Sequence, residues 1–142
     1  MRRQSGQTLI MFAITMTFMF LSLVALVGDA VTLMVRYNQV NSEALLAAQA
    51  GATAVDEDAF YQGQHRLDMN LAESNCYGTK LLGGTRQTHW VESCAPVAGA
   101  PDTITATVRW DVSLPIPLFF PQATVRSTRT GRAVFGGQQA VP

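Results

Sequence analysis

The stretch QTLIMFAITMTFMFLSLVALVG, from Gln7 to Gly28, contains no charged residue over 22 positions and consists mainly of large apolar side chains. A helix of this length spans roughly 30 Å, which is the hydrocarbon thickness of a bilayer. A helix that is apolar on every side must be surrounded by lipid or by other protein. We therefore expect residues 7–28 to form a single transmembrane helix.

The residues on either side of this helix predict its orientation. Arg2 and Arg3 precede it in a short segment, residues 1–6, whereas Asp29 closes it on the other side. Basic residues accumulate in the short cytoplasmic flanks of membrane helices. We expect residues 1–6 to be a cytoplasmic leader, Asp29 to mark the membrane exit, and the rest of the chain to lie outside. The alternative is a secretory signal peptide, whose apolar region is normally about 7–15 residues long.

The helical pattern continues beyond the membrane segment. Apolar or small residues recur at three- and four-residue spacing from Val31 to Gly51. The residues expected on the polar face are Arg36, Gln39, Glu43 and Gln49. One continuous helix ending near residue 55 would be roughly 70 Å long. Residues 29–55 should therefore form an amphipathic spine outside the membrane.

Small side chains gather at the end of this spine. Small residues let another backbone approach closely, although alanine is also the best helix former and needs no partner. Glycine costs about 1 kcal/mol relative to alanine inside a helix, so Gly51 favours a packing role. We expect close helix packing, against this domain or against another subunit, at Ala44, Ala47, Ala48, Gly51 and Ala52.

Residues 56–142 predict an external domain with both helix and sheet. The acidic cluster at residues 56–58 lacks the ligand spacing of a calcium loop and is expected to be a solvated helix end. Residues 60–75 have the spacing of a short second helix. The Gly83-Gly84 pair predicts a β-hairpin over residues 76–94, and two prolines predict a loop at residues 95–102.

The clearest strand is residues 103–114, where apolar and polar residues alternate throughout, and residues 122–134 are expected to return beside it. The predicted fold class is therefore α+β. A long N-terminal helix, transmembrane and then amphipathic, carries a small antiparallel sheet of about four strands. This is the shape of a pilin.

Composition excludes several kinds of function. Ten basic residues balance ten acidic ones, which argues against nucleic-acid binding. His65 and His89 have no partner at catalytic or metal-ligand spacing, so we expect no enzyme, cofactor or metal site. Trp90 should pack in the core with His89 on the opposite strand face. Cys76 and Cys94 should form a disulfide in an oxidising compartment, the alternative being two unpaired thiols.

Several motifs resemble the TadE/TadG-like proteins of the tight-adherence (Flp-type) pilus system. The basic leader followed by Gly6-Gln7 and LIMFAITM resembles the family's N-terminus. Asp29 and RYNQVNSEALLAAQAGATA resemble the end of the membrane helix and its Ala-rich continuation in the TadG-like branch. The later strands and the PLFF turn resemble the family's C-terminal sheet more loosely.

The resemblance implies a minor pilin or pseudopilin-like assembly component that supports pilus biogenesis and surface adherence. Its site would be the bacterial inner membrane, with the N-terminus cytoplasmic and the C-terminal domain periplasmic or extracellular. Its partners would be other pilin-like subunits and the assembly platform, and a prepilin peptidase could cut between Gly6 and Gln7. Met11 stands where cleaved pilins usually carry Glu, which the TadG-like branch also commonly lacks. The alternative function is a single-pass, membrane-tethered binding or sensory domain unrelated to pili.

Overall fold

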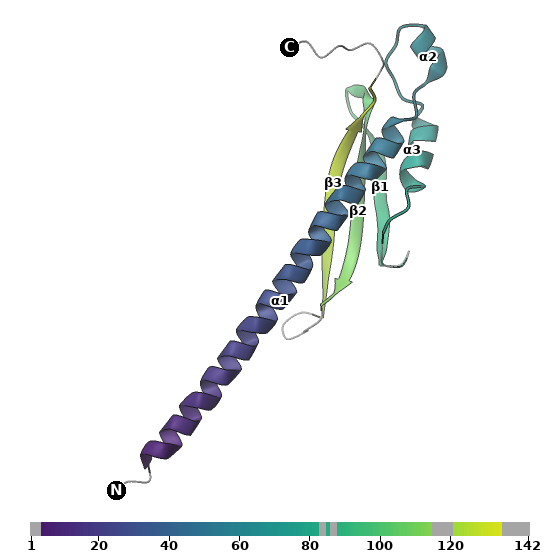
Figure 1. Ribbon diagram of the computed structural model, residues 1–142. Coiled ribbons are helices and arrows are strands. Elements are labelled where there is room, and N and C mark those ends of the chain that lie inside the picture. Colours follow the sequence, from purple (N-terminus) through teal and green to yellow (C-terminus); the bar gives the residue numbers. More distant parts are fainter. Residues whose placement is uncertain (1–3, 83–84, 86–87, 115–120, 135–142) are drawn as a thin grey trace, which may run out of the picture.

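The computed structural model describes residues 4–82, 85, 88–114 and 121–134, with side chains from Gln7 onward. These residues have the α+β arrangement expected, a long N-terminal helix followed by a small antiparallel sheet (Figure 1). In chain order the elements are α1 (Gln4–Ala52), α2 (Glu57–Tyr61), α3 (Met69–Tyr77), β1 (His89–Val97), β2 (Ala100–Ser113) and β3 (Gln122–Arg132).

Helix α1 is unbroken over 49 residues, which corresponds to a length of about 73 Å. The prediction of one continuous helix is confirmed. Its first half extends away from the rest of the molecule, and its second half lies along the sheet (Figure 1). The helix ends at Ala52, where the Thr53 hydroxyl donates a hydrogen bond of 2.7 Å to the Ala50 carbonyl.

Two short helices follow α1, and each begins at an aspartate. Asp56 accepts a hydrogen bond from the Ala59 amide, and Asp68 accepts from the amides at positions 70 and 71. Such carboxylates satisfy the unpaired N–H groups of a first helical turn. The single helix predicted over residues 60–75 is therefore wrong in extent, because the turn at Gly63 (φ +76°) and the cap at Asp68 divide that region.

The sheet has the order β1-β2-β3 and is antiparallel throughout. The central strand β2 confirms the alternation predicted for residues 103–114. Its inward side chains are buried beneath α1: Ile104, Ala106, Val108, Trp110 and Val112. Strand β3 corresponds to the strand predicted over residues 122–134. The other face of the sheet carries threonines and the ion pairs Arg109–Asp111 and Arg126–Glu92.

The hairpin predicted over residues 76–94 is wrong. Cys76 and Tyr77 end helix α3, and residues 78–82 form no strand. Ala72 and Cys76 are four residues apart and both buried, so their helix face packs into the core, which outweighs the strand tendency of the run. Strand β1 pairs instead with β2 across a tight turn at Gly99 (φ +80°), within the predicted loop. The described residues therefore form three strands rather than four.

Other predicted features lie outside the described residues. These are the first three residues of the leader predicted over residues 1–6, the Gly83-Gly84 turn and the PLFF turn at residues 117–120.

Candidate functional site

The first half of α1 exposes an apolar surface on all sides. Leu9 is 70% exposed, Phe18 67% and Phe20 66%, and the large side chains between them are similarly uncovered. Monomeric soluble proteins rarely expose a contiguous apolar area of this extent. This part of the helix therefore needs lipid or protein around it.

Three hydroxyl side chains in this half are bonded within the helix. The hydroxyls of Thr15, Thr17 and Ser22 each donate to the backbone carbonyl four residues earlier, at 2.8–2.9 Å. Inside a bilayer every polar group must find such an internal partner, because no water is present. These three hydroxyls are therefore compatible with lipid.

Of the residues described, one helix is long and apolar enough to cross a membrane, from Gln7 to Ala52. A signal sequence near the N-terminus meets the same criteria, so length and composition are weak evidence when taken alone. Gly6 and Gln7 lie in the first turns of this helix, and Asp29 is half-buried on it.

The small-residue stripe packs within this chain. A Cβ added at Gly51 would lie 3.0 Å from Ile104 Cδ1 of β2 and 3.1 Å from the Ala72 carbonyl of α3. A Cβ added at Gly131 of β3 would lie 2.2 Å from the Ala48 carbonyl of α1. Close approach was correctly expected, but its main neighbour is the chain's own sheet rather than a second helix. The stripe residues are all buried here: Ala44, Ala47, Ala48, Gly51 and Ala52.

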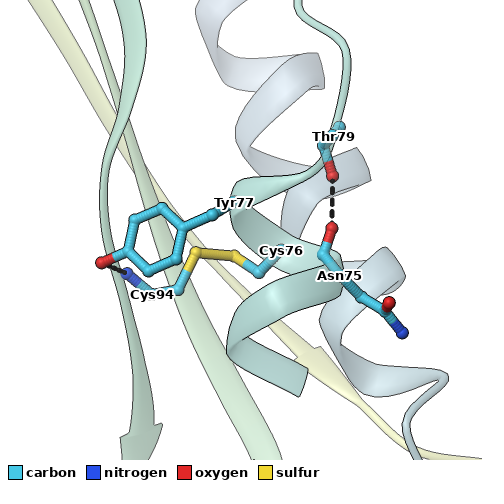
Figure 2. The surroundings of a disulfide bond; sticks show 5 residues. All are labelled: Asn75, Cys76, Tyr77, Thr79 and Cys94. Atoms are coloured by element: carbon cyan, nitrogen blue, oxygen red, sulfur yellow. Dashed lines mark hydrogen bonds between the residues drawn. A yellow bond between two sulfur atoms is a disulfide. The ribbon is translucent and has the colours of Figure 1, made fainter. Parts of the chain in front are cut away.

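The disulfide predicted between Cys76 and Cys94 is confirmed (Figure 2). It joins α3 to β1, with 6.3 Å between the two Cα atoms, instead of closing a hairpin. The Tyr77 ring lies beside the bridge, and its hydroxyl accepts a hydrogen bond of 3.1 Å from the Cys94 amide. The bridge therefore fixes α3, which packs against α1, to the edge strand β1.

The acidic cluster at residues 56–58 serves the local fold. The Ala59 amide, and next the Arg66 guanidinium at 2.8 Å, hold the pKa of Asp56 below its ordinary value of 3.8. In the described part of the chain, no group of three or more His, Cys, Asp or Glu side chains could hold a metal ion. The cluster is a helix cap with one ion pair.

Three residues, His89, Trp90 and Glu43, lie on the opposite side from the one predicted. His65 is exposed as expected, but His89 is buried and Trp90 is half-exposed beneath Arg109, 5.2 Å from the ring centroid. Alternation correctly placed the two neighbours on opposite faces, and the face assignment was reversed because Trp90 is the more apolar. Glu43, expected on the polar face of the spine, is also buried. Its sequence position between Val40 and Ala47 was the available clue.

No family model, curated protein or solved structure matches this chain.

Proposed function

We propose that the protein is a membrane-anchored structural or assembly component of a tight-adherence pilus, similar to a minor pilin. The observation that supports this is the division of α1. Its first half is bare and apolar, while its second half carries the sheet on a stripe of small residues. A half-exposed helix with a sheet head on its upper part is the pilin shape that the TadE/TadG-like resemblance implies.

The rigidity of α1 favours assembly over a simple tether. A tethered binding domain needs only a flexible connection to its anchor, whereas α1 passes from the apolar half into the head without a break. Such a rod fixes the distance and orientation of the head relative to the membrane. That property is useful to a subunit that must stack on its neighbours.

The outward face of α1 supplies a surface for those neighbours. Leu45 is 41% exposed and Leu46 52% exposed, although both lie in the half of α1 that carries the sheet. In our proposal, other pilin-like subunits pack on this face, and the bare half lies in the bacterial inner membrane. The head then lies on the periplasmic or extracellular side, as Arg2 and Arg3 predict.

Co-purification from native membranes tests the proposal. A tagged full-length chain should bring down other pilin-like subunits or the assembly platform. Leu46→Arg should abolish this association, because burying an unpaired charge in an apolar contact costs free energy. The matched control is Leu71→Arg, on the exposed side of α3, where the leucine is 49% exposed; it should co-purify normally.

Recovery of the chain alone, or equal recovery by both variants, would exclude this assembly role and favour the tethered domain. The intact mass of the membrane-extracted protein then shows whether the chain is cut between Gly6 and Gln7.

A further inference from the structure

The charged residues of α1 beyond its apolar run lie on one side of the helix. They are Asp29, Arg36 and Glu43, spaced seven residues apart, which is close to two helical turns. The Arg36 guanidinium lies 4.5 Å from the ring centroid of Trp110 on β2, and the Glu43 carboxylate lies 2.7 Å from His89 of β1. The charged side of α1 is therefore the side that faces the head, and Asp29 lies on that side as well.

The far side of α1, opposite the head, stays apolar further along the chain. Its side chains remain exposed beyond the position of Asp29, with Val31 57% exposed, Met34 68% and Val35 57%. The first polar side chain after them on this side is that of Asn38, which is also exposed. The apolar surface of the far side therefore ends about two turns later than the apolar surface on the head side.

An inclined helix accounts for this difference between the two sides. When a rod leaves a flat layer at an angle, the side that faces the layer emerges further along the rod than the upper side. Asp29 and Val35 are six residues apart, which is about 9 Å along the axis of a helix that is about 10 Å wide. These two lengths correspond to an inclination of roughly 40° from the membrane normal, at the upper end of the range for transmembrane helices.

The length of the apolar run agrees with that angle. At roughly 40° a helix needs about 26 residues to cross a hydrocarbon layer that is about 30 Å thick. Counted from Gln7, where the uncharged run begins, the crossing ends about midway between Asp29 and Val35. An upright helix would leave the layer about five residues earlier, and the last apolar side chains would then lie in water.

Tyr37 gives a second, independent observation. Its side chain is 49% exposed and lies about one turn beyond Met34. Tyrosine is enriched at the membrane–water interface, where its ring lies at the level of the lipid headgroups. Tyr37 therefore has the position and the chemistry of an interfacial anchor just beyond the last apolar side chains.

We propose that the far side of α1 contacts lipid as far as Val35, so that the helix crosses the bilayer at an inclination of roughly 40°. This inference rests on the membrane anchoring in the proposed function, and the partner of this surface is a phospholipid bilayer. Val31, Met34 and Val35 lie among the acyl chains, whereas Asp29 lies at the bilayer surface on the head side. The head is held on the upper side of the leaning helix.

Fluorescent labels at matched positions measure where the lipid ends. Cys76 and Cys94 are bonded to each other, so one added cysteine is the single thiol that an NBD dye would label. Val35→Cys and Ser42→Cys are seven residues apart on the far side and both positions are exposed, and Leu21→Cys, also exposed, marks the middle of the apolar run. Each full-length protein would be reconstituted at low density into phosphatidylcholine vesicles that contain nitroxide-labelled lipid, which quenches NBD on contact.

The labels in Leu21→Cys and Val35→Cys should both be quenched and emit at shorter wavelength, whereas the label in Ser42→Cys should emit as it does in water. An unquenched label in Val35→Cys beside a quenched one in Leu21→Cys would overturn this inference and leave the membrane anchor intact. Equal quenching in Val35→Cys and Ser42→Cys would overturn it too, because the lipid boundary would then lie beyond Ser42. No quenching in any of the three would overturn the membrane anchoring itself.

Polarised infrared absorption of the unlabelled protein in oriented bilayers measures the inclination directly. The 49 residues of α1 dominate the helical amide I band, so the dichroism of that band should correspond to an axis roughly 40° from the membrane normal. An axis close to the normal would overturn the inclination. Neither measurement depends on pilus subunits, so failure here leaves the assembly role to its own test.

Discussion

At the scale of single residues, two kinds of position differ in how well the sequence predicts them. The close-packing role of Gly51 follows from its local pattern. Glycine lowers helix stability relative to alanine, so a glycine among alanines at four-residue spacing indicates that close packing offsets this loss. The contact between Glu43 and His89 does not follow from the sequence, because the two residues are 46 positions apart and each is of a type usually found on the surface. A polar residue on a buried helix face is detectable from spacing, but its partner is fixed only by the tertiary fold.

Gly131 gives a prediction at this scale. Gly131→Ala should destabilise the head by about 1–3 kcal/mol, which is the usual range for overpacking. The added Cβ would lie 2.2 Å from the Ala48 carbonyl oxygen, and a backbone atom of α1 cannot move aside as a flexible side chain could. The matched control is Gly28→Ala, since no atom lies within 4 Å of a Cβ added there. Thermal unfolding followed by near-ultraviolet circular dichroism measures both. Equal melting temperatures for the two variants would contradict the packing of β3 on α1.

At the scale of elements, the longest and most periodic segments were predicted correctly. α1 and β2 each repeat one pattern over many residues, so local sequence determines their type. Two other predictions were wrong. The hairpin over residues 76–94 failed because the helix capped at Asp68 extends through Tyr77, and the loop at residues 95–102 failed because much of it belongs to the edge strand β1 and to β2. Pro96 is tolerated in β1 because an edge strand leaves one side unpaired, and the Pro101 carbonyl accepts a hydrogen bond of 3.0 Å from the Leu67 amide.

The disulfide supplies the prediction for the elements. The bridge joins residues 18 apart, and the chain-entropy estimate for a loop of this size is about 3 kcal/mol. The double variant Cys76→Ser/Cys94→Ser should therefore melt at a lower temperature than the oxidised protein. Wild-type protein treated with reductant is the control and should melt at the variant's temperature. Labelling of native protein should find no free thiol, and quantitative labelling would show that the bridge does not form in the cell.

At the scale of the whole molecule, the arrangement follows from what each part of α1 can bury. The apolar half has no sheet beside it, whereas the stripe from Ala44 to Ala52 is small enough for β2, β3 and α3 to approach. The sequence therefore predicted a rod with a head at one end. It could not predict that the head would use the entire stripe, because a small-residue face is equally suited to a neighbouring subunit.

The orientation of this rod is the last prediction. Arg2 and Arg3 precede an uncharged run of 22 residues, and Asp29 follows it, so the basic side should stay in the cytoplasm and the head should cross the membrane. A tag placed at the C-terminus should be digested when protease is added to intact spheroplasts. A cytoplasmic marker protein is the control and should survive the same treatment. Moving the two arginines to the other flank, as Arg2→Gln/Arg3→Gln with Thr32→Arg/Asn38→Arg, should protect the tag in at least part of the molecules. A tag protected in the wild-type protein would reverse the topology, and because a head in the cytoplasm could not stack on an extracytoplasmic filament, the pilus proposal would be lost with it.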